Sequence, residues 1–134
     1  MAMDIFDVSG RAMSAQLVRL NTTASNLANA GSVAGSEAAA YRSRKAIFAT
    51  ALDAASNARA TVDVEQVVTA GPVPVRRHEP GHPLADKDGY VWEAGVDATA
   101  EMVEMLETAR QYQNNAEVLR TAKSLLSATL KIGQ

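Results

Sequence analysis

The fold is decided by the stretch DIFDVSGRAMSAQLVRLNTTASNLAN, residues 4–29, which has the pattern of one long helix. The stretch contains no proline, and its single glycine is Gly10. Two rows of mostly apolar residues repeat every seven positions, which is the a/d pattern of a coiled-coil seam. The first row is Phe6, Met13, Leu20 and Leu27, and the second is Met3, Gly10, Leu17 and Ala24. The pattern therefore predicts an N-terminal helix that packs on another helix.

The same pattern returns near the other end of the chain, over residues 97–131. One row is Met102, Ala109, Ala116, Lys123 and Leu130, and the other is Met105, Tyr112, Leu119 and Leu126. Acidic residues come early in this segment and basic residues late, which complements the helix dipole. Asp97 is expected to cap the first turn. Lys123 is the one charged residue in the two rows, and an antiparallel helical hairpin would bring it close to Asp7.

The segment between the two helices has a different character, because it contains all four prolines. Residues 41–52 and 61–68 have short strand-like patterns, whereas residues 71–75 contain two prolines and cannot form a central strand. An Asp-Gly turn precedes a third strand pattern at residues 90–92. Residues 31–40 are expected to form a loop of small residues.

The predicted fold is mainly α: two long terminal helices form a coiled-coil-like hairpin with a small β-rich insertion between them. The expected division is a rod helix at 1–31, the insertion at 32–96 and a second rod helix at 97–134.

Composition narrows the classes of function. The chain has 134 residues, a net charge of −2 and 26 alanines. Because so much of its apolar content is alanine, the chain has few large apolar side chains. Such a composition suits thin contacts between helices or subunits better than a thick core. The balanced charge argues against nucleic-acid binding. With no cysteine, the chain has neither disulfides nor a thiolate metal site. No apolar stretch is long enough to span a membrane, and the N-terminus lacks the features of a cleavable secretory signal.

One segment matches a zinc-protease string, His78-Glu79-Pro80-Gly81-His82. That chemistry needs both histidines on one helical face. A proline and a glycine between them oppose a helix, so the segment is predicted to be a loop. A metallohydrolase using His78 and His82 remains an alternative that the pattern does not favour. We therefore expect no catalytic residues, no cofactor and no metal.

Several stretches resemble the flagellar rod and hook protein family. Ala24-Ser25-Asn26-Leu27-Ala28-Asn29-Ala30, followed by Tyr41-Arg42, is similar to the N-terminal signature of that family. The resemblance to the proximal rod members in particular rests on residues 79–86, 88–91, 96–97, 101–103, 110–113, 117–126 and 129–134. Ala94-Gly95 departs from the family, which often has Pro-Asn there.

The resemblance implies a structural subunit of the proximal rod in the bacterial flagellar basal body. Such a subunit leaves the cytoplasm through the flagellar type III export apparatus without a cleaved signal. In the periplasm it assembles with copies of itself and other rod proteins into a tube that transmits torque. It binds no nucleic acid and has no membrane span. The alternative is a soluble export adaptor or chaperone with a helical hairpin.

The expected assembly residues combine this resemblance with the heptad rows. Leucines and Ile132 would be buried contacts, and Tyr112 an aromatic anchor. The asparagines would satisfy backbone groups where the first helix ends, while Gly10, Ala109 and Ala116 would permit close helix approach. The full set is Gly10, Leu20, Ser25, Asn26, Leu27, Asn29, Ala109, Tyr112, Ala116, Leu119, Lys123, Leu126, Leu130 and Ile132.

Overall fold

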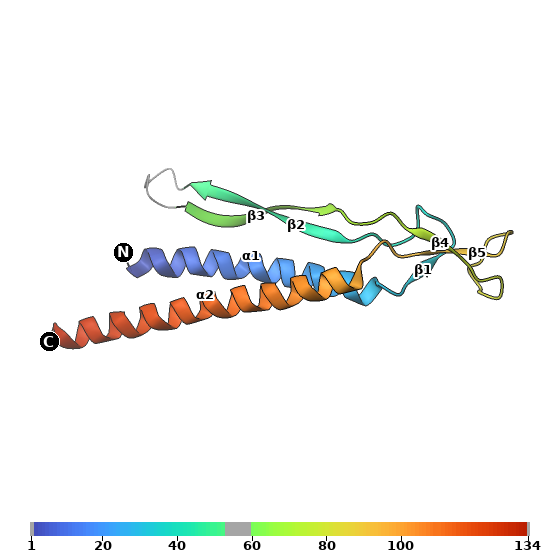
Figure 1. Cartoon of the computed structure of the whole chain (residues 1–134). Coiled ribbons are helices and arrows are strands. Elements are labelled where there is room, and N and C mark those ends of the chain that lie inside the picture. The colour runs from blue at the N-terminus through green and yellow to red at the C-terminus, as the bar shows by residue number, and fades with distance from the viewer. Residues whose placement is uncertain (1, 53–59, 134) are drawn as a thin grey trace.

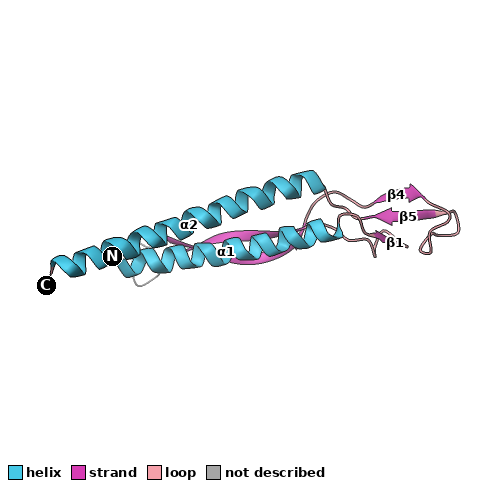
Figure 2. Cartoon of the chain, turned by 90° about the horizontal axis from the view of Figure 1, so that it is seen from below, coloured by secondary structure: helices cyan, strands magenta, loops and turns pink. Residues whose placement is uncertain are grey.

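Two long helices lie side by side and antiparallel, with a β-rich region between them in the chain (Figure 1). The computed structural model describes residues 2–52 and 60–133. Helix α1 (Ala2–Asn29) and helix α2 (Ala98–Ile132) confirm both predicted helices. Their free ends, which carry the two chain termini, lie at the same end of an elongated molecule (Figure 2).

The start and end of α2 follow from local hydrogen bonds. Asp97 is the N-cap, as predicted, and its Oδ1 accepts a hydrogen bond from the Ala100 N–H at 3.1 Å. At the other end, the Gly133 N–H donates to the Thr129 carbonyl at 3.2 Å. Together these bonds satisfy backbone groups that a helix leaves unpaired at its termini.

A long hairpin of β2 (Arg44–Leu52) and β3 (Ala60–Thr69) runs along α1. The register shifts between Ile47, which pairs with Gln66, and Phe48, which pairs with Val64. Glu65 is therefore the extra residue of a β-bulge, and bulges increase the local twist of a hairpin. Helix α1 lies between this hairpin and α2 (Figure 1), so it forms the middle layer of the molecule.

A second, smaller sheet forms the end of the molecule away from the termini (Figure 1). It consists of β1 (Val33–Ala34), β5 (Tyr90–Glu93) and β4 (Val75–His78), in the order β1-β5-β4 and all antiparallel. The predicted strand at residues 90–92 is confirmed as β5. The loop prediction for residues 31–40 was wrong at β1, because a strand of two residues is too short to show an alternating pattern.

The interior of the molecule is thin. Among the residues whose side chains the structure describes, the buried apolar ones are Ala15, Val91 and Ala122, together with Pro74 and two glycines. The accessible surface is 8980 Å², whereas a compact monomer of this mass would expose about 6,700 Å². The chain thus has much more exposed surface than a globular domain of equal size.

The residues of the predicted apolar rows are not all buried between the two helices, as a coiled-coil seam would require. Phe6, Met13, Leu20 and Leu27 are half-buried, but Leu17 of the second row is exposed. On α2, Met102 is 59% exposed, while the polar Thr108 is fully buried against its neighbours. A regular coiled-coil seam within one chain is therefore not confirmed. Helix α1 contacts the β2–β3 hairpin as well as α2, so one seam does not account for all its buried positions.

The predicted pair between Lys123 and Asp7 was wrong. In the described part of the chain, Asp7 pairs with Arg11 of its own helix at 3.6 Å, and Lys123 is exposed. Arg11 also reaches Asp63 of β3 at 3.2 Å. Asp7 therefore belongs to the contact between α1 and the hairpin rather than to the contact between the helices.

Candidate functional site

The side chain of Asn26 ties the end of α1 to the start of β2. It is 1% exposed and lies three residues before the helix ends. Its Nδ2 donates to the Arg44 carbonyl at 2.8 Å, and its Oδ1 accepts from the Arg44 N–H at 2.9 Å. Oδ1 also accepts from the Tyr41 hydroxyl at 2.8 Å. One amide thus satisfies both backbone groups of the first residue of β2 and fixes where the hairpin leaves the helix.

The neighbouring signature residues finish the helix. Asn29 Nδ2 donates to the Ser25 carbonyl at 2.8 Å, which satisfies a carbonyl in the last turn of α1. The Ser25 hydroxyl lies 3.4 Å from the Tyr41 hydroxyl, and Leu27 is half-buried. The two asparagines therefore have different roles: Asn29 forms a hydrogen bond within the helix, and Asn26 forms hydrogen bonds to the strand beyond it.

Gly95 marks a second junction, where the chain passes from β5 toward α2. Its N–H donates to the Tyr41 carbonyl at 2.7 Å, and its carbonyl accepts from the Ser43 N–H at 3.1 Å. A Cβ added at Gly95 would lie 2.1 Å from the Pro72 carbonyl oxygen. The close approach of the two backbone segments therefore leaves no room for a side chain at position 95.

Polar side chains set the alignment of α1 and α2. Arg19 contacts Glu104 through both Nε and Nη2, and Gln16 Nε2 donates to Gln111 Oε1 at 2.8 Å. The guanidinium of Arg19 also lies 5.7 Å from the centre of the Phe48 ring of β2. Arg19 therefore joins α1, α2 and the hairpin at one point, with a cation–π contact in addition to the ion pair.

The structure separates most of the expected assembly residues into two groups. Asn26 is buried and Ser25 of α1 is exposed, and the remaining residues divide as follows. The half-buried ones are Gly10, Leu20, Leu27, Asn29, Ala109, Tyr112, Ala116 and Leu119. Lys123, Leu126, Leu130 and Ile132 are exposed. The members of the second group all lie in the last third of α2.

The exposure of these residues follows from the length of α2. Ile5 lines a groove with Ala122 and Leu125, so α1 begins opposite the turn that follows Leu125. The end of α2 continues beyond the start of α1 (Figure 1), and the groove that Ile5 shares with Leu125 indicates that this part comprises residues 126–132. In this segment, which we call the overhang, Leu126 is 41%, Leu130 66% and Ile132 87% exposed. Leu126 and Leu130 follow Ala122 at intervals of four, so they extend the buried face of α2 past its partner.

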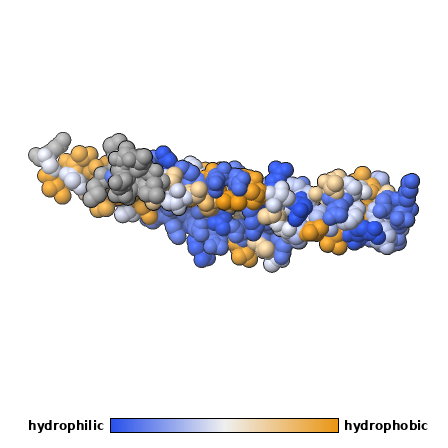
Figure 3. All heavy atoms as spheres, turned by 90° about the horizontal axis from the view of Figure 1, so that it is seen from above, coloured by the Kyte–Doolittle hydropathy of each residue, from blue (hydrophilic) through white to orange (hydrophobic). Residues whose placement is uncertain are grey.

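Sequence reasoning missed part of the apolar surface of α2: Met102 was in a predicted row and Ile132 in the expected assembly set, but Leu106, Val118 and Leu125 were in neither. Met102 and Leu106, four residues apart, are both exposed near its start. Val118, Leu125 and Ile132 recur every seven residues and are exposed as well. The seven-residue spacing was visible in the sequence, but the predicted rows placed the seam on other faces. Figure 3 shows apolar atoms gathered at the end of the molecule formed by α2.

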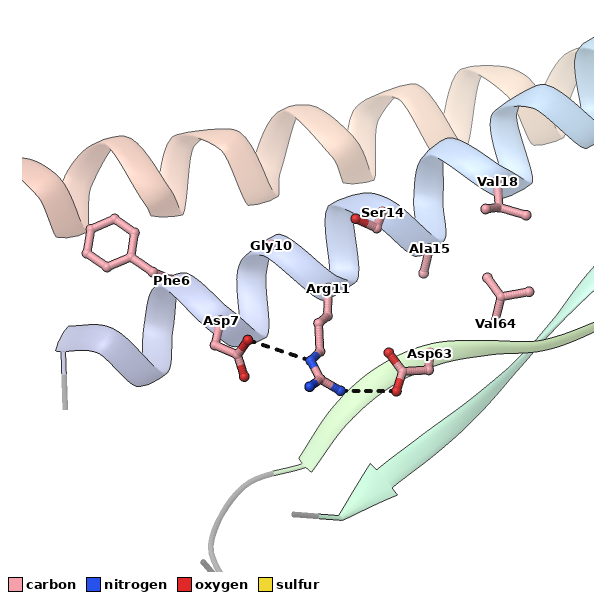
Figure 4. Close-up of a pocket in the computed structure, with 9 residues that line it drawn as sticks. All are labelled: Phe6, Asp7, Gly10, Arg11, Ser14, Ala15, Val18, Asp63 and Val64. Atoms are coloured by element: carbon pink, nitrogen blue, oxygen red, sulfur yellow. Dashed lines mark hydrogen bonds and ion pairs between the residues drawn. The ribbon is translucent and has the colours of Figure 1, made fainter. Parts of the chain in front are cut away.

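An open groove of about 400 Å³ lies between α1 and β3 (Figure 4). Four of its residues, Phe6, Gly10, Ser14 and Val18, follow one another at intervals of four along α1. Val64 of β3 lies across from them. Two small residues between two larger ones make a notch in the surface of α1, and we call this the α1–β3 groove.

The loop prediction for residues 78–82 was wrong at His78, which pairs with Tyr90 as the last residue of β4, whereas the residues that follow it form a turn. The His82 N–H donates to the Glu79 carbonyl at 3.0 Å, and His82 Nδ1 accepts from the Leu84 N–H at 3.0 Å. The ring of His78 packs edge-on against Tyr90, with 5.0 Å between their centres. Within residues 2–52 and 60–133, no three His, Asp or Glu side chains gather where they could hold a metal ion.

An ion pair next to this loop shifts two pKa values. Arg77 donates to Glu79 at 2.8 Å, which lowers the pKa of Glu79 and raises the pKa of Arg77. Both side chains are exposed to solvent, so water weakens the interaction. This cluster carries no signature of catalysis.

Comparisons with known proteins agree with the arrangement of the helices. A family model described as flagella basal body rod protein matches residues 6–35, and one described as flagellar basal body rod FlgEFG protein C-terminal matches residues 87–132. Relatives named flagellar basal-body rod protein FlgC are 45% identical in Yersinia enterocolitica, 44% in Salmonella typhimurium and 36% in Buchnera aphidicola subsp. Schizaphis graminum. Each alignment covers 98% of this chain and 98% of the relative. Of the helices that the structure describes, none is long and apolar enough to cross a membrane.

Proposed function

The chain belongs to the flagellar basal-body rod protein family and is a structural subunit of the rod, and from this premise we propose that its two terminal helices join it to neighbouring subunits in the proximal rod. The observation that carries the proposal is the exposed apolar surface of α2, above all the overhang. Contiguous apolar surface exposed on a soluble protein marks an interaction site. A rod provides neighbours on several sides that can cover it.

The exposed heptad positions indicate which faces of the helices would contact neighbouring subunits. Leu17 on α1 and Met102 on α2 occupy coiled-coil positions, yet both are exposed in the single chain. Helices of adjacent subunits would complete the coiled-coil-like packing that one chain leaves open. In this scheme residues 1–31 and 97–134 form the rod contacts and residues 32–96 are carried between them.

The route to the rod is part of the same proposal. The subunit would pass through the flagellar type III export apparatus without a cleaved signal and assemble in the periplasm. Its partners there would be copies of itself and other rod proteins. Relatives that are structural rod proteins support this route over that of a soluble export adaptor. Fractionation tests the choice, because a rod subunit stays with detergent-extracted basal bodies whereas an adaptor is washed away.

The substitution Leu126→Asp tests the role of the overhang. Leu126 extends past the start of α1, so the monomer should fold and be exported normally. A carboxylate buried between subunits without a partner costs several kcal/mol, so incorporation into basal bodies and motility should be lost. Val73→Asp is the matched control, because Val73 is also exposed but its neighbours Pro72 and Pro74 lie against Gly95, at the opposite end of α2 from the overhang. Motile cells carrying Leu126→Asp would contradict the proposal.

A further inference from the structure

The α1–β3 groove has a feature that packing within one chain does not explain. Gly10 lies in the middle of α1, where glycine is less favourable than alanine for a helix. Among the described residues, no atom would lie within 4 Å of a Cβ added there. The absence of a side chain therefore relieves no contact inside the subunit. Ser14, one turn later, is also small and is exposed.

The groove has a shape that accepts side chains from a second helix. Phe6 and Val18 stand at the two ends of the notch, and Gly10 and Ser14 form its floor (Figure 4). Small residues in the middle of a helix face form the hole into which a large side chain of another helix inserts. The volume of about 400 Å³ gives room for several aliphatic side chains.

The overhang of α2 supplies side chains of that kind. Leu130 and Ile132 are among its exposed residues, and α1 does not extend far enough to cover them. The overhang carries one charge, from Lys131. The groove carries a net charge of −1, because Asp7 and Asp63 outnumber Arg11. The overhang and the α1–β3 groove therefore carry opposite net charges, and the groove has room for the large apolar side chains of the overhang.

Resting on the proposed function, we propose that the overhang of one subunit inserts into the α1–β3 groove of a second copy of this chain. The contact joins two different surfaces, so it is heterologous and repeats from subunit to subunit. An interface of that type builds rings or helical filaments, as a rod requires. In this contact, residue 129 of one copy lies level with residues 10–14 of the other. At the rise of an α-helix, this requires a shift of about 20 Å between the two copies along the long axis of the molecule.

Cysteine cross-linking tests this contact directly, since the chain contains no cysteine. In one chain, positions 10 and 132 lie roughly 20 Å apart along the helix axes, whereas a disulfide joins Cα atoms within about 7 Å. A disulfide in Gly10→Cys/Ile132→Cys must therefore join two chains. We expect a ladder of cross-linked multimers when assembled basal bodies are oxidised. The control Ala28→Cys/Ile132→Cys, with Ala28 exposed outside the groove, should give none.

Filling the notch gives a second, independent test. The monomer of Gly10→Leu should melt at an unchanged or higher temperature, because the space is open and leucine favours a helix. Its incorporation into basal bodies should fall at least tenfold, whereas Gly10→Ala should fall less. Normal assembly of Gly10→Leu, or a cross-link to a different protein, would overturn this inference. If Leu126→Asp blocks assembly in the same assay, the proposed function stands; if it does not, the proposed function fails as well.

Discussion

Replacing Asn26 by alanine should remove the main polar link between α1 and the hairpin. The change deletes three hydrogen bonds and leaves the N–H and carbonyl of Arg44 without their partner. An orphaned buried backbone group costs about 1–3 kcal/mol. The Tyr41 hydroxyl can turn toward the Ser25 hydroxyl at 3.4 Å, so we assign it little cost. The free energy of unfolding should therefore fall by roughly 3 kcal/mol.

Urea unfolding of the purified monomer, followed by circular dichroism, measures this loss. The matched control is Asn29→Ala, which deletes one hydrogen bond at an exposed helix end and should cost less than about 1 kcal/mol. Asn26→Asp sharpens the test, because an ionised carboxylate cannot donate to the Arg44 carbonyl but a protonated one can. Relative to the wild type, its defect should shrink at acidic pH while that of Asn26→Ala does not. Equal stability of the Asn26 and Asn29 alanine variants would refute the reasoning.

Two further predictions concern the β-rich region. Gly95→Ala should destabilise the monomer by about 2 kcal/mol or more, because the new Cβ would clash with the Pro72 carbonyl. Gly31→Ala is the control, because a Cβ there meets open space and should change stability little. Thermal melts of the two variants test the difference. Arg77→Leu should raise the pKa of Glu79 toward its ordinary value in a carboxyl NMR titration, and an unchanged value would show that Arg77 does not cause the shift. Because the pKa of Glu79 is lowered, its small contribution to stability is present at neutral pH and is lost as the pH falls through that pKa.

The helices were predictable because their signals are local. Heptad spacing, the absence of proline and the Asp97 cap all lie within the segments that they define. The strand β1 was not predictable, because its two residues become a strand only by pairing with β5. The bulge at Glu65 was hidden for the same reason, since it depends on the register against Ile47 and Phe48.

The site was predictable only in part. The signature asparagines pointed to backbone contacts at the end of α1, but the sequence could not identify Arg44 as the partner of Asn26. The heptad rows identified apolar positions without saying which of them would be covered. That depends on the hairpin, which occupies one side of α1, and on the unequal lengths of the two helices.

The position of α1 in the middle layer has a consequence for how the rod responds to mutation. Helix α1 already packs against α2 on one side and the hairpin on another, whereas α2 has element contacts with α1 alone in the described part of the chain. Substitutions on α1 should therefore more often affect the stability of the subunit. Substitutions on the outward face of α2, at positions such as Leu106 and Leu125, should more often affect assembly. With so little apolar surface buried inside one chain, neighbours that bind the folded form also stabilise it by mass action. Folding and assembly of this subunit are thus linked through the same alanine-rich helices.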